Sequence, residues 1–290
     1  MNLKKEIKKP YFSNLGRIDV ANINRLIRVN KIARQKGFTL TELVISTGLS
    51  IFLSASLIQV YLSSAQTDTL IHQQSLIQEN ARFAFRFVGE NIMHAGFSGS
   101  IRELDNALVN TSIPFNDLGI IFTNPSHVVI GYDNKGDANN RPSGERDNTD
   151  QLFIRYQGIQ AGAGEDAPLT DCLGVSLEDK EIVQIRYYLG KKSENDSLLC
   201  ASYIEGRSKA YQSQPLIDNV KNLQFLYGLD LNNDGAVNIF VPASDTRLNG
   251  GEKNWNRVAA IKMQISLQSE NENIEKEFSE IIRLRNRTLY

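Results

Sequence analysis

Residues 38–62, FTLTELVISTGLSIFLSASLIQVYL, decide the fold, because they form an uninterrupted apolar segment with one charged side chain, Glu42. As a helix rising 1.5 Å per residue, this segment reaches about 38 Å, which is long enough to cross a bilayer. Holding a carboxylate at bilayer depth costs about 2.5–3.5 kcal/mol on insertion scales. We therefore expect Glu42 to have a pairing partner, and a second helix of the same kind is the first candidate.

The segment before the apolar run is basic. Residues 1–37 carry ten Lys and Arg against Glu6 and Asp19, and this excess predicts a cytoplasmic N-terminus with the later chain on the far side of the membrane. Gly37 is the small residue at the junction, and it precedes the apolar run instead of following it as in a secretory signal peptide. Cleavage after Gly37 would leave the helix attached and create a new α-amine on Phe38, one helical turn from Glu42.

The junction KGFTLTELVIS resembles the class III signal of type IV pilins and type II secretion pseudopilins. The resemblance implies that a prepilin peptidase cuts after Gly37, that Phe38 becomes an N-methylated N-terminus, and that Glu42 guides assembly into a filament. Residues 1–37 are then a cleaved leader, longer than is usual for the family, and 38–62 the transmembrane and filament-core helix. The plain alternative is a signal anchor with a chance Gly-Phe pair.

Residues 63–96 predict a continuation of the same helix. They contain no Pro, and apolar residues recur at three-to-four spacing until Gly96, where the helix should end. The apolar set comprises Leu70, Ile77, Ala81, Ala84, Phe85, Val88 and Ile92. One helix over 38–95 would be about 85 Å long. The aromatic cluster of Phe83, Phe85 and Phe87 is interpreted as core, and His72 and His94 lack metal-ligand spacing.

Residues 97–290 predict a β-rich globular head. Seven short β-rich runs stand between polar turns: 127–132, 151–157, 182–189, 198–204, 223–229, 258–267 and 278–284. Several alternate apolar and polar residues, which favours an antiparallel sheet with one buried and one wet face. The predicted fold class is α+β: a long N-terminal helix, transmembrane and then amphipathic, packed on an antiparallel sheet head, the lollipop form of a pilin.

Two features of the head suggest specific sites. Cys172 and Cys200 are the two cysteines of the chain, and an even count outside the cytoplasm predicts a disulfide. The text around Asp230, Asn232, Asp234 and Gly235 resembles the front of a calcium loop. Val241 stands at the twelfth loop position instead of Glu, and the oxygens that could complete a cage belong to Asn238, Asp245 or Glu252. A polar turn between strands explains the same residues.

The C-terminal third extends the resemblance. The stretches PLIDNVKNLQFLYGLDLNNDG, WNRVAAIKMQISLQS and FSEIIRLRNR, with DCLG around Cys172, resemble PilW-type minor pilins. The likeness implies a low-abundance subunit that joins other minor pilins and the major pilin through helix packing, in a priming complex at the filament tip. Its other implied partners are the prepilin peptidase, the inner-membrane assembly platform and a large tip adhesin. It also implies a single-pass inner-membrane precursor with a periplasmic head, which later becomes part of an extracellular pilus serving adhesion or twitching motility.

Two other functions stay open, a J-class pseudopilin of type II secretion and a membrane-tethered adhesin or ligand-binding module. The polar stretch 133–150 is either a surface loop or a contact surface. The chain's formal charge of -1 includes the leader's surplus of eight, so the processed chain is about -9, which disfavours nucleic acid. An enzyme is not expected, because the sequence holds no nucleophile set, phosphate loop or paired-His motif.

Overall fold

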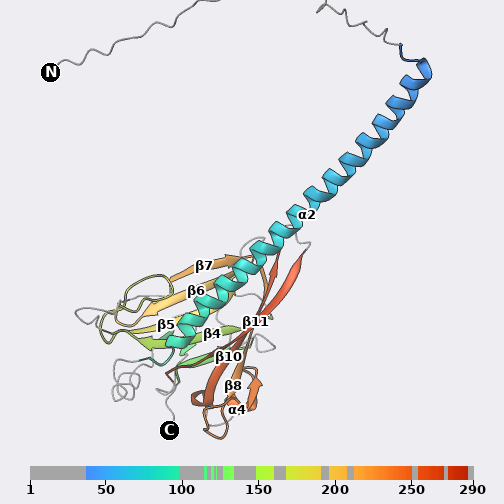
Figure 1. The fold of residues 1–290 in the computed structure, drawn as a ribbon. Coiled ribbons are helices and arrows are strands. Elements are labelled where there is room, and N and C mark those ends of the chain that lie inside the picture. Colours follow the sequence, from blue (N-terminus) through green and yellow to red (C-terminus); the bar gives the residue numbers. More distant parts are fainter. Residues whose placement is uncertain are drawn as a thin grey trace, which may run out of the picture. The chain divides into compact units, whose positions relative to one another are not determined.

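A computed structural model describes residues 37–97, 114–115, 119–120, 122, 127–133, 148–159, 168–190, 196–207, 212–249, 254–270 and 274–286 (Figure 1). The chain divides into two compact units, residues 1–63 and 64–290. Most of the predicted leader and of the polar stretch 133–150 lies outside the described residues.

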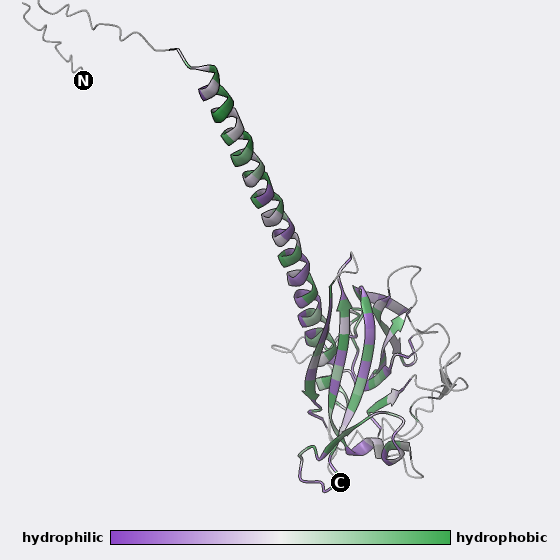
Figure 2. Ribbon diagram, turned by 90° about the vertical axis from the view of Figure 1, so that its right-hand side faces the viewer, coloured by the Kyte–Doolittle hydropathy of each residue, from purple (hydrophilic) through white to green (hydrophobic). Residues whose placement is uncertain are grey.

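Helix α2, Leu40–His94, is one α-helix of 55 residues. It ends where the sequence predicted, because Gly96 adopts a φ of 75°, a left-handed conformation that a glycine takes without steric cost. Up to residue 63 every described residue of the helix is exposed, whereas the helix residues from Ile77 onward include eight that are buried. Figure 2 shows hydrophobic residues prevailing in the first part of α2 and polar ones appearing further along.

Five strands of the described chain form the first sheet in the order in which they occur, β3-β4-β5-β6-β7, all antiparallel. Their bounds are β3 Val129–Tyr132, β4 Gln151–Gln157, β5 Ile182–Gly190, β6 Ser197–Ile204 and β7 Gln212–Asp218. The expectation of one wet face is wrong for β4, which is buried along its whole length, and for most of β5. The face of β4 that carries Arg155 is also covered. The Arg155 guanidinium lies 4.6 Å from the ring centroid of the buried Phe122.

The second sheet has four antiparallel strands in the order β11-β10-β8-β9. Their bounds are β8 Val220–Leu229, β9 Ile239–Val241, β10 Val258–Gln268 and β11 Glu275–Arg283. The remaining described elements are the β1 Pro114–Phe115 and β2 Gly119–Ile120 pair, the short helix α4 Thr246–Asn249 and the 3-10 turn η1 Asn254–Arg257. The seven predicted strands are present with bounds shifted by up to three residues, whereas β1, β2, β7 and β9 were not predicted.

The C-terminal part of α2 packs on the sheets with one face. Ala84, Val88 and Ile92 have no exposed surface, and a side chain at Gly89 would touch Ile282 of β11 at 3.6 Å. Two predictions for this helix are wrong, namely Leu70 on its buried apolar face and Phe83 in its aromatic core cluster, because each side chain is 47% exposed. Phe83 instead stacks on the half-buried Phe87, with ring centroids 5.7 Å apart, while Phe85 is buried as expected.

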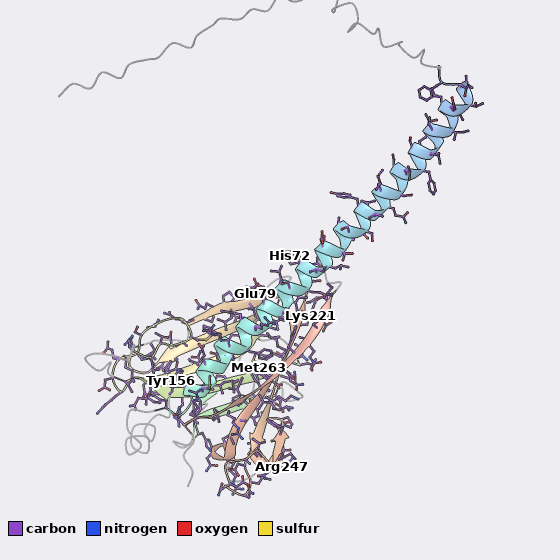
Figure 3. The ribbon with its side chains drawn as sticks, in the orientation of Figure 1. His72, Glu79, Tyr156, Lys221, Arg247 and Met263 are labelled. Atoms are coloured by element: carbon purple, nitrogen blue, oxygen red, sulfur yellow. A yellow bond between two sulfur atoms is a disulfide. The ribbon has the colours of Figure 1, made fainter. Side chains whose placement is uncertain are left out.

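Polar bonds join the helix to the strands at the same place. The Tyr156 hydroxyl of β4 bonds to Asn91 Oδ1 of α2 at 3.2 Å and donates to the Thr170 carbonyl at 2.8 Å. Figure 3 labels Tyr156 near the end of α2. The His94 ring lies 5.8 Å from the Tyr156 ring, and burial lowers the pKa of His94. These contacts fix how α2 ends within the second unit.

Candidate assembly site

The helix begins with a capping box. The backbone amide and the hydroxyl of Thr39 both donate to Glu42 Oε2, at 2.9 and 3.0 Å, and the Glu42 amide donates back to Thr39 Oγ1 at 3.2 Å. A Thr at the N-cap with a Glu three residues later satisfies two helix-end donors reciprocally. Within the chain, the Glu42 carboxylate therefore has local partners, which reduce the cost of placing it in an apolar segment. Thr39 was not among the predicted site residues, although the spacing Thr-x-x-Glu is the sequence signature of a capping box.

The predicted processing site lies just before this cap. Phe38 is 89% exposed, and a side chain built on Gly37 would meet no atom within 4 Å. Gly37 and Phe38 lie outside the helix, which starts at Leu40. The structure thus places Gly37, Phe38 and Glu42 in one exposed segment at the start of α2.

The apolar surface that follows has no partner in the described part of the chain. α2 is the one described helix long and apolar enough to cross a membrane, and its most apolar window is not buried at all. Its most exposed large side chains, each at least 70% exposed, are Leu40, Ile51, Phe52, Leu57 and Tyr61. A soluble helix with these side chains around it would expose a large apolar patch, so lipid or other helices are the expected environment.

The structure pairs the two cysteines in a disulfide, as predicted. Cys172 and Cys200 are 28 residues apart with Cα atoms at 6.4 Å, and both are buried. Cys172 lies in a tight turn in which Asp171 Oδ1 accepts the amides of Leu173 and Val175, at 2.9 and 2.7 Å. The bond ties this turn to β6.

The candidate calcium residues form a polar turn after β8. Asp230 has no exposed surface, and its carboxylate accepts the amides of Asp234 and Gly235, at 3.2 and 2.9 Å. Asp234 accepts the Ala236 amide at 2.7 Å and the Asn232 side-chain amide at 2.9 Å.

The residues considered for completing the cage have other surroundings. Asn238 Oδ1 accepts the Leu231 amide at 2.6 Å, Asp245 pairs with Arg247, and Glu252 lies outside the described residues. No group of three metal-ligating side chains of the His, Cys, Asp and Glu types occurs among the residues that the structure describes. These hydrogen bonds are of the kind expected for the alternative interpretation of residues 230–235, a polar turn between strands.

Comparisons with known proteins concern the C-terminal part of this fold. Residues 186–290 match the family described as "Type IV Pilus-assembly protein W", and this span runs from within β5 through β11. The resemblance to PilW-type minor pilins read from the sequence is confirmed over these residues. No protein with a curated description matches the chain significantly.

One solved structure is similar in part: the crystal structure of the GspK-GspI-GspJ complex from the enterotoxigenic Escherichia coli Type 2 Secretion System. The similarity has 10% sequence identity and a TM-score of 0.30, and it covers 55% of this chain and 76% of the other.

Proposed function

We propose that this chain is a minor pilin that takes part in type IV pilus assembly. The observation that carries the proposal is the coincidence of two features in one chain. The C-terminal 105 residues match the pilus-assembly family, and the N-terminal helix starts with a capped acid followed by an exposed apolar run. In this proposal the role is structural, because the helix inserts among similar helices.

The proposed precursor crosses the inner membrane once, with the leader in the cytoplasm and the head in the periplasm. The basic leader supports this orientation, and so does the disulfide, because such bonds persist in oxidising compartments. Prepilin peptidase then cuts after Gly37, and the Phe38 amine is N-methylated. The processed subunit joins other minor pilins in a complex that primes the filament, remains at its tip and holds a larger tip protein there.

In this assembly Glu42 has two alternative sets of partners. In the monomer its carboxylate accepts from Thr39, and in the filament it meets the α-amine of a neighbouring subunit. Both sets of bonds are charge-assisted because the carboxylate is ionised, but the α-amine also brings an opposite full charge, whose attraction is strong in the low-dielectric core of a helix bundle. The exchange therefore favours the filament over the separate subunit.

The test uses two substitutions with matched controls on the same helix. Replacing Gly37 by Asp is expected to leave residues 1–37 attached, as measured by the mass of the purified chain, whereas Gly48→Ala, at an open position, is processed normally. Glu42→Ala is expected to leave membrane insertion intact and to remove the chain from sheared filaments. The exposed Gln59→Ala is expected to preserve both membrane insertion and filament incorporation. Normal filament incorporation of both Gly37→Asp and Glu42→Ala would show that the helix is only a tether.

A further inference from the structure

Strand β11 is a long open edge of the four-stranded sheet. Among the described strands it pairs with β10 alone, over nine residues in continuous register. The other outer strands are short or interrupted: β3 and β9 have four and three residues, and β7 contains Pro215 and shifts its register with β6. Short strands, proline and bulges are common means of preventing further pairing at an edge. β11 has none of these, so it can accept a further strand.

The hydrogen-bond phase of β11 shows which groups are available. The Leu284 amide donates to the Ala259 carbonyl at 3.0 Å, so even-numbered residues of β11 bond to β10. The odd-numbered residues accordingly direct their N–H and C=O groups to the open side. Side chains also alternate, and Ile282 lies on the face that packs on α2, so the odd-numbered side chains lie on the opposite, outer face. These residues are Glu275, Glu277, Ser279, Ile281 and Arg283, and each is exposed.

β11 runs in the same direction as the part of α2 that packs beside it. A side chain at Gly89 would touch Ile282 at 3.6 Å, and the Asn286 side-chain amide donates to the Met93 carbonyl at 3.1 Å. Later residues of the helix thus meet later residues of the strand. In the proposed function, two subunits anchored in one membrane have α2 helices that point the same way. Their β11 strands therefore run parallel to each other.

The hydrogen-bond phase restricts how two parallel β11 strands can pair. In a parallel pair, a residue that bonds to the neighbouring strand is aligned with a residue that bonds away from it. Each odd-numbered residue must therefore be aligned with an even-numbered residue of the other copy, and a stagger of one residue keeps the longest overlap. Aligned side chains lie on one face, so the second copy is turned over. The two α2 helices then lie on opposite faces of the joined sheet and still point the same way.

The charges of β11 fit this stagger. Lys276 of each copy shares a face with Glu275 and Glu277 of the other copy, aligned with one carboxylate and diagonal to the other. Glu280 of one copy is diagonal to Arg283 of the other. Glu277 and Glu280 form the one diagonal pair of like charge within the strand. Opposite charges thus outnumber like charges across the pair, which favours a second copy of the chain as the partner.

The exposed Ile281 matches a groove beside the same strand. Ile281 is 55% exposed on the outer face of β11. On the other face, a groove of about 370 Å³ lies between α2 and the C-terminal half of the strand, and its apolar lining includes Phe85, Gly89, Met93 and Ile282. A turned-over copy presents its Ile281 on this face, next to Ile282. Each Ile281 then enters the groove of the other copy.

We propose that β11 pairs in parallel, with a stagger of one residue, with β11 of a second copy of this chain. Backbone hydrogen bonds along the edge, ion pairs around Lys276 and the two Ile281 contacts hold the copies together. The inference goes beyond the proposed function, from which it takes only the shared membrane anchoring that sets the direction of the strands.

Cysteine cross-linking of the full chain in membranes tests direction and stagger. Ser279→Cys in one copy and Glu280→Cys in a differently tagged copy would be aligned on one face, with Cα atoms about 5 Å apart, within reach of a disulfide. Two Ser279→Cys copies would instead point to opposite faces. After mild oxidation, we expect about fivefold or more product on a non-reducing gel for the mixed pair than for Ser279→Cys with itself. The native cysteines do not interfere, because they form the disulfide.

A charge exchange in these cysteine variants tests the ion pairs. Lys276→Glu is expected to lower the cross-linked fraction of the mixed pair about three- to tenfold, because it places like charges together. Adding Glu275→Lys and Glu277→Lys to the same chains reverses all three charges and is expected to restore the cross-linked fraction. A loss that the exchange does not restore would contradict the proposed pairing.

A substitution at Ile281 tests the groove contact. Ile281→Asp is expected to lower the cross-linked fraction about three- to tenfold, whereas Ile239→Asp, at a residue of β9 that is 37% exposed, should leave it unchanged. Equal effects of the two substitutions, more product from Ser279→Cys alone than from the mixed pair, or adducts to another protein only would overturn the proposal. Cross-linking is expected to persist when Gly37→Asp prevents processing, which separates this pairing from the proposed pilus assembly.

Discussion

At the scale of single residues, Gly131 of β3 shows how closely the two sheets approach. A Cβ atom added there would overlap the Tyr227 side chain of β8, which is fully buried. Tyr227 in turn packs on Trp255, with ring centroids 4.8 Å apart, and Trp255 is the single tryptophan of the chain. Its fluorescence is therefore a probe of unfolding at this junction.

Gly131→Ala is expected to destabilise the protein by about 1–3 kcal/mol, because the added methyl forces a rigid aromatic ring to move. The measurement is urea unfolding of the full chain in detergent, followed by Trp255 fluorescence. Tyr227→Phe is the companion variant. The Tyr227 hydroxyl has no hydrogen-bond partner in the described part of the chain, so its removal should change the free energy of unfolding by less than about 1 kcal/mol. Equal effects of the two substitutions would contradict this explanation.

The disulfide is expected to contribute about 3–4 kcal/mol, because it closes a loop between residues that are 28 positions apart. Replacing Cys172 and Cys200 by Ala should lower the urea midpoint accordingly. Wild-type protein unfolded in the presence of reductant should then show the midpoint of the double variant. A reductant effect that persists in the double variant would mean that the loss has another origin.

Single residues were also predicted from the sequence with uneven success. Glu42 stood out because an acid inside an apolar run is rare, and the cysteines because there are only two. Gly131 gave no such signal, since its importance depends on a contact with Tyr227, 96 positions later. Asp230 was found by its spacing, but only its hydrogen bonds to Asp234 and Gly235 show how the turn is held.

At the scale of elements, α2 changes its surroundings along its length. Ile92 has no exposed surface, whereas Leu70 is 47% exposed on the same helix. Ile92→Ala is therefore expected to cost about 2–5 kcal/mol of unfolding free energy, by loss of buried surface and creation of a cavity. Leu70→Ala is the matched control and should cost less than about 0.5 kcal/mol. Comparable losses in urea unfolding would show that the helix is buried further toward its start.

The sequence predicted the positions of the helix and strands better than it predicted which of their faces are buried. Periodicity located α2 and seven strands because each pattern is local. The same alternation misled for β4, where Arg155 and Gln157 were expected on a wet face. Arg155 is fully buried instead, its Nε donates to the His127 carbonyl at 2.8 Å, and burial lowers its pKa to about 10. A polar residue in an alternating strand is thus not proof of solvent, because a buried backbone acceptor can satisfy it.

At the scale of the whole molecule, the division after residue 63 predicts an independent domain. None of the described residues between 37 and 63 is buried, so the buried side chains that the structure describes all belong to the second unit. The fragment 64–290 is expected to be soluble and to unfold at the urea midpoint of the full chain, within about 0.5 kcal/mol. Trp255 fluorescence of both proteins makes the comparison. A fragment that is unfolded without urea would refute this prediction.

The fold class could be predicted from the sequence, whereas the division into two sheets could not. A long helix and several short strands indicate α+β by composition and period alone. Which strands share a sheet depends on pairings such as β8 with β10, whose residues are about 40 positions apart and carry no mark of each other. The family match over residues 186–290 does not specify which strands of this region pair or in which register.

The strand order of the first sheet has a consequence for biogenesis. Strands β4 to β7 each pair with the strand that precedes them in the chain, so this sheet needs no pairing between strands that are distant in chain order. In the proposed topology, the head crosses the membrane after the helix, and these strands emerge one after another. The sheet would then form strand by strand during export, which keeps its apolar strands from remaining unpaired.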